Sequence, residues 1–260
     1  MNPSRTEDRV ALVTGGAQGI GAALARRLAG SGARVVVADV DEDAGRAVAD
    51  GIGGRFIRCD VGALADNEAA VALAVREFGG LDLVALNAGV ATGFGLGGDF
   101  DPDRYRRAMA VNLDGVVYGA HAALPALRAR GGGDILVTAS LGGLAPLPQD
   151  PVYGANKAAV IALVRALGLA WKAEGVRVNA VCPGYTDTRI VDGLRGTLAD
   201  AGVPLLDVST VVDTFLAALS SGRTGEAWYV QPGRPGEPYR FPGVPGIRPT
   251  EPVAAPTQKG

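Results

Sequence analysis

Val10-Ala-Leu-Val-Thr-Gly-Gly-Ala-Gln-Gly-Ile-Gly21 is the stretch that decides the fold of this 260-residue chain. Its apolar start predicts a strand over residues 10–14, and the Ala- and Leu-rich run behind it predicts a helix over residues 19–29. Glycines at 15, 19 and 21 would let the backbone turn tightly and approach a pyrophosphate at the amino end of that helix. The spacing Gly-x-x-x-Gly-x-Gly leaves a longer loop than G-x-G-x-x-G. A merely flexible turn is the alternative, but this position, the first strand–helix turn, favours a dinucleotide site.

The same alternation of short β-branched runs and Ala- and Leu-rich runs continues along the chain, which predicts successive parallel βαβ units. Further strands are predicted over 35–39, 56–59, 81–86, 135–139, 176–182 and 227–231. Further helices are predicted over 42–50, 64–78, 102–130, 152–173 and 208–219. The sequence therefore predicts one α/β domain over residues 1–231, a Rossmann-type, three-layer, doubly wound fold with a seven-stranded parallel sheet. Residues 232–260 hold eight of the sixteen prolines and predict an extended tail.

Composition argues against several classes of partner. The net charge of −2 gives no basic surface for nucleic acid or an anionic membrane. Cys59 and Cys182 lack the short spacing of a zinc site or a disulfide framework, and the single histidine, His121, cannot build a His-rich metal site. We therefore expect no metal and two reduced thiols in a cytoplasmic protein. The polar segment Met1–Arg9 is no signal peptide, and no run of about 18 apolar residues predicts a membrane span.

Two carboxylates end predicted strands where a nucleotide would lie. Asp39 follows Gly21 by eighteen residues and is placed to accept hydrogen bonds from the adenosine ribose hydroxyls, while it would repel a 2′-phosphate. The glycine loop holds no Arg or Lys, and Val40 follows Asp39, so NAD is favoured over NADP. Asp60 ends the third strand and either accepts from the adenine amine or caps the following turn; spacing alone leaves both open.

Tyr153 and Lys157 stand four apart near the start of a predicted helix, so they share one helix face. A nearby ammonium favours a phenolate and lowers the phenol pKa from about 10. Ser140 supplies a hydroxyl where the 135–139 strand stops. A Tyr–Lys pair by itself is commonly surface chemistry, and the nucleotide loop is what favours a catalytic pair here.

Taken together, the residues resemble a known family. Thr14-Gly-x-x-x-Gly-Ile-Gly21, Asn87-Ala-Gly89, Ser140, Tyr153-x-x-x-Lys157 and Pro183-Gly184 with Thr188 occur here in the order found in the single-domain branch of the short-chain dehydrogenase/reductase family. The resemblance covers Arg9 to Gln231. It implies that Asn112 completes a Ser–Tyr–Lys–Asn catalytic tetrad, with its backbone or side chain holding a water that continues a proton path from Lys157. It also implies a homodimer or homotetramer built through the 102–130 and 152–173 helices.

The resemblance and the spacing together give the expected cofactor site. Its residues are Gly15, Gln18, Gly19, Ile20, Gly21, Asp39, Asp60, Val61, Asn87, Ala88, Gly89, Tyr153, Lys157, Pro183, Gly184, Thr186 and Thr188. The resemblance implies that Thr188 touches the nicotinamide carboxamide. Three departures from the family pattern stand out: Leu86 replaces an Asn, Thr186 replaces an aliphatic residue, and Gln231-Pro-Gly-Arg replaces an acidic-Gly-Gly ending.

The substrate pocket is expected in the loops 89–100, 141–151 and 185–206, at the carboxyl ends of the strands. Leu141, Gln149 and Tyr185 are its candidate lining residues. Because these loops are rich in Gly, Leu, Pro and Phe, we expect a fairly apolar secondary alcohol or ketone, interconverted by NAD-dependent hydride transfer with Tyr153 as general acid/base. The positive charges of Arg189 and Arg195 in the 185–206 loop are the main argument against an apolar substrate. The alternatives are an NADP-dependent carbonyl reductase of the same fold and a non-catalytic dinucleotide sensor.

The tail beyond residue 231 could be a substrate lid, a subunit clasp or disordered. Trp228, Tyr229, Tyr239 and Phe241 cluster around its start and favour an ordered cover.

Overall fold

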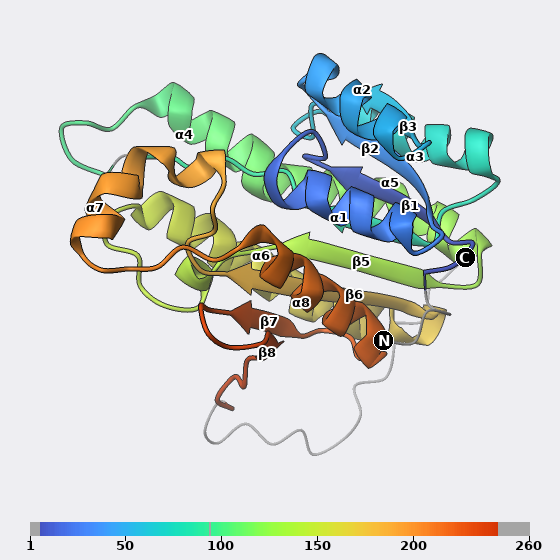
Figure 1. The fold of residues 1–260 in the computed structure, drawn as a ribbon. Coiled ribbons are helices and arrows are strands. Elements are labelled where there is room, and N and C mark those ends of the chain that lie inside the picture. The colour runs from blue at the N-terminus through green and yellow to red at the C-terminus, as the bar shows by residue number, and fades with distance from the viewer. Residues whose placement is uncertain (1–5, 94, 244–260) are drawn as a thin grey trace.

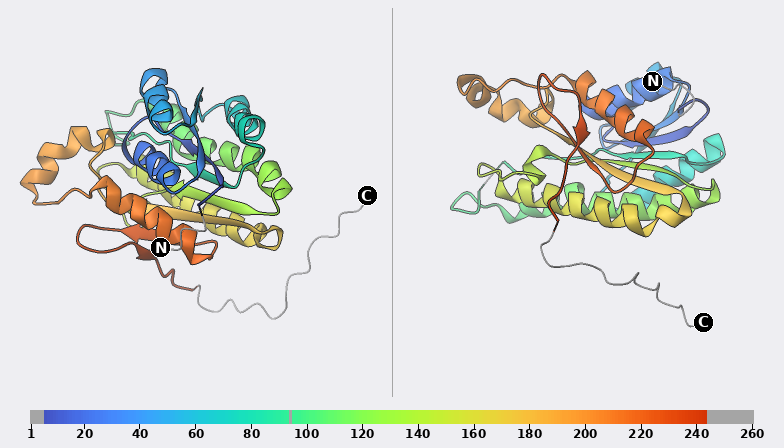
Figure 2. Two further views of the ribbon diagram at one scale, coloured as in Figure 1. Left: turned by 45° about the vertical axis from the view of Figure 1, so that its right-hand side comes forward. Right: turned by 90° about the horizontal axis from the view of Figure 1, so that it is seen from below.

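The computed structural model describes residues 6–93 and 95–243, which form one sheet covered by helices on both faces (Figures 1 and 2). The strand order is β3-β2-β1-β4-β5-β6-β7-β8. The strands are β1 Val10–Thr14, β2 Arg34–Asp39, β3 Arg55–Arg58, β4 Leu83–Leu86, β5 Gly133–Thr138, β6 Val176–Pro183, β7 Ala227–Val230 and β8 Glu237–Pro238. The helices are α1 Gly19–Gly30, α2 Glu42–Gly51, α3 Leu64–Phe78, α4 Pro102–Met109, α5 Gly115–Ala129, α6 Pro151–Ala170, α7 Arg195–Asp200 and α8 Val208–Ser221.

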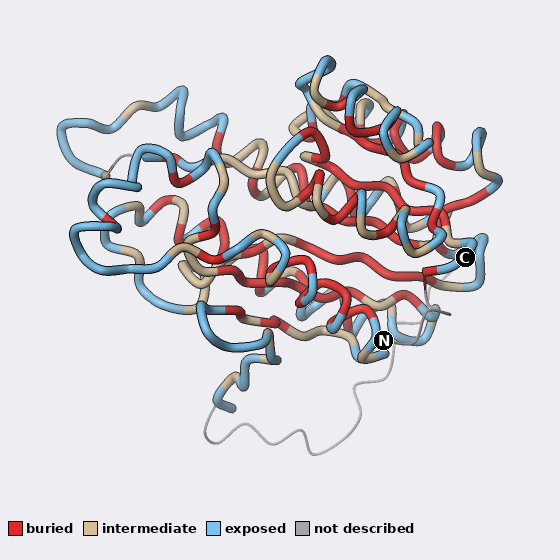
Figure 3. The backbone as a smooth tube through the Cα atoms, viewed as in Figure 1, coloured by how far each residue is buried: buried red, intermediate tan, exposed pale blue. Residues whose placement is uncertain are grey.

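The first seven strands are parallel, as the sequence predicts, and β8 adds an antiparallel eighth. Strands such as β1 are buried along their whole length because helices cover both faces of the sheet (Figure 3). One core layer joins the sheet to α1, α2 and α8, and the other joins it to α3, α5 and α6. The strand order reverses between β1 and β4, so a crevice opens at their carboxyl ends.

The helix predicted over 102–130 is interrupted in the structure. A π-helical turn, Ala110–Asp114, separates α4 from α5 and contains the buried Asn112. Such turns are rare and occur frequently at functional sites. The sequence prediction missed it because the apolar periodicity runs through the turn without a Gly or Pro to mark it.

Helix α6 is, among the described residues, the one helix long and apolar enough to span a membrane by length and composition, although the sequence predicted no such segment. It packs on the sheet through Val160, Ile161 and Val164, so here it is a core helix. Leu169 on α6 and Val117 on α5 are 75% and 42% exposed. The predicted homodimer or homotetramer, in which a second copy of the chain would cover such residues, stays a prediction.

The described part of the tail, residues 232–243, adds β8 to the edge of the sheet. In β8, Glu237 pairs with Tyr229 and Pro238 with Trp228. Beyond it, the ring of Phe241 lies 3.8 Å from the Arg165 guanidinium carbon on α6. Within residues 232–243 no side chain lines either of the cavities described below, and β8 covers the edge of β7. Residues 244–260 of the expected tail lie outside the described residues.

At the amino ends of β5 and β6, Asp134 forms the most buried ion pair of the described chain. Its carboxylate is 2% exposed and accepts from Nε and Nη2 of Arg177, both at 2.7 Å, and from Nη2 of Arg9 at 2.7 Å. These contacts fix the start of the strand that ends at Thr138, beside the site.

Replacing Asp134 by Ala should lower the free energy of unfolding by about 3 kcal/mol, because two guanidinium groups lose their buried partner. Urea unfolding measures the loss. Glu174→Ala, which breaks the exposed pair with Arg128, is the control and should cost much less. Equal losses in the two variants would contradict the conclusion that the buried ion pairs of Asp134 stabilise the fold.

Candidate active site

The turn between β1 and α1 comes too close to its neighbours for side chains. Gly15 has φ of +61°, and a Cβ there would lie 2.8 Å from the Cα of Ala88. A Cβ on Gly21 would lie 2.1 Å from the carbonyl oxygen of Gly15 and 2.6 Å from Nδ2 of Asn87. The glycines are therefore required by packing of the first turn against the segment after β4, and they leave a backbone cradle at the amino end of α1.

Asn87 holds this cradle together. Its Nδ2 donates to the carbonyl oxygens of Thr14 and Gly15, each at 3.1 Å, and its Oδ1 accepts from Oγ1 of Thr138 at 2.8 Å. Its backbone N–H donates to Oγ1 of Thr14 at 3.0 Å. One side chain thus joins the carboxyl ends of β1, β4 and β5. The roles of Thr14 and Thr138 were not predicted, because a strand-end Thr carries no spacing signal of its own.

The two strand-end carboxylates stand at the far end of the cradle. Asp39 accepts from the backbone N–H of Ala17 at 2.9 Å and of Asp41 at 3.0 Å, so it is fixed against the glycine turn. Asp60 accepts from the N–H of Gly62 at 3.0 Å, which is the turn-capping alternative. Both residues also line the cavity described next.

Two cavities meet at the carboxyl ends of the strands. The larger, of about 1030 Å³, extends from Asp39 and Asp60 past the glycine turn to Thr188. The smaller, of about 270 Å³, lies under the loops that follow β5 and β6. The two share six lining residues: Ile20, Asn87, Gly89, Thr138, Thr188 and Ile190.

The structure distributes the predicted site residues between these cavities. The larger is lined by Gly15, Gln18, Gly19, Ile20, Asp39, Asp60, Val61, Asn87, Ala88, Gly89 and Thr188. The smaller is lined by Ile20, Asn87, Gly89, Ser140, Leu141, Gln149, Tyr153, Lys157, Pro183, Gly184, Tyr185, Thr186 and Thr188. Gly21 and Asn112 line neither. Thr186 is 4% exposed, and its hydroxyl donates to the Gly184 carbonyl at 3.1 Å.

Arg107, Asp150 and Ile190 also line these cavities. The sequence did not name them individually, although Asp150 and Ile190 lie in the loops 141–151 and 185–206 that it predicted for the pocket. Arg107 lies on α4 with no motif around it, and Ile190 lies on the 3₁₀ turn Arg189–Leu194 just after Thr188. Asp150 had a local signal, since an aspartate directly before Pro151 and a helix is a typical N-cap.

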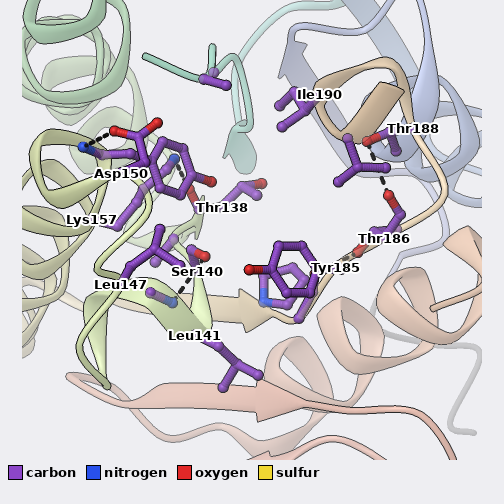
Figure 4. Close-up of a pocket in the computed structure, with 18 of the residues that line it drawn as sticks. Thr138, Ser140, Leu141, Leu147, Asp150, Lys157, Tyr185, Thr186, Thr188 and Ile190 are labelled. Atoms are coloured by element: carbon purple, nitrogen blue, oxygen red, sulfur yellow. Dashed lines mark hydrogen bonds between the residues drawn. The ribbon is translucent and has the colours of Figure 1, made fainter. Parts of the chain in front are cut away.

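Ser140, Tyr153 and Lys157 all line the smaller cavity. Figure 4 shows Ser140 and Lys157 there. Ser140 follows β5, and its Oγ accepts from the Gly142 N–H at 3.1 Å, which starts a short 3₁₀ turn. Lys157 is 2% exposed, and its Nζ donates to the carbonyl oxygen of Thr138 at 2.8 Å. That Nζ lies 5.6 Å from the ring centroid of Tyr153. The end of β5 thus positions both the hydroxyl and the ammonium beside the phenol.

The electrostatics differ from the sequence expectation that Lys157 lowers the phenol pKa. Burial raises the pKa of Tyr153 to about 12, against a lowering effect of its hydrogen bond with Ser140, and the Asp150 carboxylate raises it further. Burial also lowers the pKa of Lys157 to about 8. Burial is therefore the largest influence on both groups, and it disfavours the phenolate and the ammonium alike.

Asn112 is fully buried and its side chain is already engaged. Its Oδ1 accepts from the N–H of Val90, and its Nδ2 donates to the carbonyl of Val90, both at 2.9 Å. The resemblance implied a water held by the backbone or the side chain of Asn112, and that role stays a prediction. A Cβ on Gly89 would lie 3.4 Å from Oδ1 of Asn112 and 3.6 Å from Nζ of Lys157, so the π-helical turn does approach the site.

Comparison with known proteins agrees with this arrangement. The sequence profile described as short chain dehydrogenase matches residues 9–198. The chain is 41% identical over 203 residues to cis-4-hydroxycyclohexanecarboxylate dehydrogenase of Sinomonas cyclohexanicum, covering 74% of this chain and 80% of that protein. It is 36% identical over 193 residues to cyclohexanol dehydrogenase of Acinetobacter sp. strain SE19, covering 72% and 77%.

A solved structure, the 3-ketoacyl-(acyl-carrier-protein) reductase of Brucella melitensis complexed with NADH, superposes with a TM-score of 0.82 at 29% identity. The alignment covers 88% of this chain and 98% of that one. The crevice, the paired cavities and these matches together assign the chain to the short-chain dehydrogenase/reductase family, oxidoreductases that act on CH–OH groups.

Proposed function

We propose that this enzyme interconverts an uncharged, apolar secondary alcohol and its ketone with NAD as cofactor. The observation that carries the proposal is the convergence of Ser140, Tyr153 and Lys157 in a small cavity that opens onto a larger one of dinucleotide size. A hydride donor or acceptor in the larger cavity would meet the substrate where the two cavities share their walls.

The larger cavity fits a nicotinamide dinucleotide. The glycine turn offers bare backbone at a helix amino end, where a pyrophosphate binds, and a side chain at Gly15 or Gly21 would fill the cradle. Asp39 and Asp60 would receive the adenosine half, and Thr188 and Ile190 lie at the other end, where the cavities join. The bound cofactor supplies or accepts the hydride; the chain supplies position and proton control.

Asp39 supports NAD over NADP. Each oxygen of its carboxylate accepts one backbone N–H and keeps lone pairs for ribose hydroxyls. A 2′-phosphate would face this fixed negative charge. Arg195 lines the same cavity but is paired with Asp187 and Asp192.

The proton step is assigned to Tyr153. In oxidation its Oη takes the proton of the substrate hydroxyl, and in reduction it returns that proton to the carbonyl oxygen. Ser140 would donate a hydrogen bond to the substrate oxygen and fix its place. Lys157, held by the Thr138 carbonyl, would keep a positive charge beside the phenolate as it forms.

The smaller cavity supports the substrate class. Its wall includes Leu141, Ala145, Leu147, Ile190, Val191 and Leu194, and Lys157 is the one cation among its lining residues. The carboxylate of Asp150 also lines it and disfavours an anionic substrate. Arg189 and Arg195, the objection raised by the sequence, line the larger cavity instead. The two relatives named for hydroxycyclohexane compounds support an alicyclic alcohol, here without a carboxylate.

Gly21→Ala tests the cradle. The new Cβ would overlap the Gly15 carbonyl, so we expect a loss of about 1–3 kcal/mol in stability and dinucleotide affinity lowered by about 10-fold or more. Calorimetric titration with NADH and urea unfolding measure both. Gly30→Ala, in the same helix but with no atom within 4 Å of its Cβ, is the control and should retain full affinity. Equal affinity in the two variants would refute the cradle.

Asp39→Ser tests cofactor choice. Loss of a charged acceptor should weaken NAD binding by about 10-fold and, by removing repulsion, strengthen NADP binding. Fluorescence titration with NADH and NADPH gives the ratio of the two affinities. Asp43→Asn removes a nearby exposed charge and should leave that ratio unchanged. An unchanged ratio in Asp39→Ser would overturn the preference assigned to this carboxylate.

Tyr153→Phe tests the proton step. We expect kcat for cyclohexanol oxidation to fall by about 10²–10⁴-fold while NADH affinity is retained. In the unaltered enzyme, oxidation should accelerate as pH rises, because the buried phenol has a pKa raised to about 12 and must lose its proton first. Tyr105→Phe, outside both cavities, is the control. Turnover by Tyr153→Phe at the control's rate would exclude Tyr153 as the proton acceptor.

A further inference from the structure

Asp150 makes more hydrogen bonds than a helix cap needs. As N-cap of α6, its Oδ1 accepts from the backbone N–H of Tyr153 at 3.0 Å. The same carboxylate accepts from the loop after β4: Oδ2 from the N–H of Thr92 at 3.1 Å and of Gly93 at 2.9 Å, and Oδ1 from the hydroxyl of Thr92. One side chain thus joins two segments that lie 57 and more residues apart in sequence.

The other aspartate caps of the described chain lack this second set of contacts. Asp41, Asp101 and Asp207 accept, in the bonds that cap their helices, only from N–H groups of α2, α4 and α8 respectively. Capping therefore explains the bond from Tyr153 but leaves the three bonds from Thr92 and Gly93 without a reason in the helix itself.

The loop that Asp150 holds forms a wall of the substrate cavity. Ala91, directly before Thr92, lines the smaller cavity. Asp150 lines the same cavity (Figure 4). Thr92 is 1% exposed, and its carbonyl accepts from Nη2 of Arg104 on α4 at 2.6 Å. The loop is thus held by Arg104 of α4 on one side and by Asp150, the N-cap of α6, on the other.

We propose that Asp150 is a positioning residue for catalysis, which holds the Ala91–Gly93 wall of the substrate cavity in register with the amino end of the helix that carries Tyr153. The proposal rests on the proposed function insofar as Tyr153 is the proton acceptor. In this proposal one carboxylate sets both the shape of the substrate cavity and the position of the phenol. Loss of the carboxylate should therefore weaken substrate binding and leave the dinucleotide cradle, built from β1 and β4, unchanged.

The charge of Asp150 gives a second, independent readout. The titratable and polar groups that face the Tyr153 phenol are Ser140 after β5, Lys157 on α6, Cys182 on β6 and Asp150. Of these, Asp150 contributes the one carboxylate, and its negative charge opposes the phenolate. Removing that charge should favour deprotonation, so the rise of alcohol oxidation with pH should move to lower pH. This shift reports the charge of Asp150 beside the phenol, whereas the KM for the alcohol reports its contacts with Thr92 and Gly93.

Two variants keep a cap for α6 but remove contacts of Asp150 with Thr92 and Gly93, which we call the bridge to the loop. Asp150→Ser keeps an acceptor for the Tyr153 N–H but is too short to reach Thr92 and Gly93, while Asp150→Asn keeps the length and loses the charge. For both we expect the KM for cyclohexanol to rise by about 10-fold, with the KM for NAD within about 2-fold of the unaltered enzyme. In both variants the rise of alcohol oxidation with pH should move to lower pH. Asp207→Ser, which alters the cap of α8, is the control and should change neither quantity.

Hydrogen exchange tests the bridge without turnover. The amides of Thr92 and Gly93 should exchange about 10-fold faster or more in both Asp150 variants and at the unaltered rate in Asp207→Ser. Unchanged exchange, or an Asp150→Ser enzyme with unaltered KM and pH limb, would overturn the proposal. If the unaltered enzyme oxidises no secondary alcohol while exchange responds as expected, the proposed function fails and the bridge stands as a structural element alone, which overturns its catalytic role.

Discussion

The Asn87 side chain carries the constraint on which the site depends. Its amide group donates to the carbonyls that end β1 and accepts from Thr138 at the end of β5, with its own strand, β4, between them. These are the three strands around the point where the sheet order reverses. A crevice there is a consequence of topology, and the Asn87 side chain adds hydrogen bonds between the strand ends beyond those of the sheet itself. The amide is suited to this work because it offers donors and an acceptor in one plane.

The consequences of this tie extend in two directions. Toward the cofactor side, it brings the β1 turn so close to the segment after β4 that Gly15 and Gly21 have no room for a Cβ. Toward the substrate side, it fixes Thr138, whose carbonyl accepts from the Lys157 ammonium. Fixing one strand end therefore sets the position of the anion cradle and of the cation beside Tyr153 together. The two cavities share Asn87 and Thr138 in their common wall for the same reason.

What the sequence could predict follows from how local each signal is. Strands, helices and the glycine turn are encoded by neighbouring residues, and all seven parallel strands were predicted within a few residues of their bounds. The π-helical turn was missed because it adds no Gly, Pro or break in periodicity. Likewise β8 was missed, because a two-residue strand with a proline gives no β pattern, and only the edge of β7 makes it a strand. Asp60 shows the intermediate case: its turn bond to Gly62 is local, while its place in the cavity depends on the whole sheet.

The pKa values of the site residues were the least predictable property, because they depend on burial and on which group each side chain contacts. From spacing, Lys157 and Tyr153 share a helix face, and that part holds in α6. Yet the ammonium donates to a backbone carbonyl, and burial raises the pKa of the phenol and lowers that of the amine. Both shifts disfavour the charged forms of the two groups, the phenolate of Tyr153 and the ammonium of Lys157, because burial removes their hydration. A positively charged nicotinamide ring beside the phenol would favour the phenolate by the same Coulomb rule that makes Asp150 oppose it. Under the proposed function, binding of such a cofactor would favour the deprotonated form of Tyr153 that accepts the substrate proton.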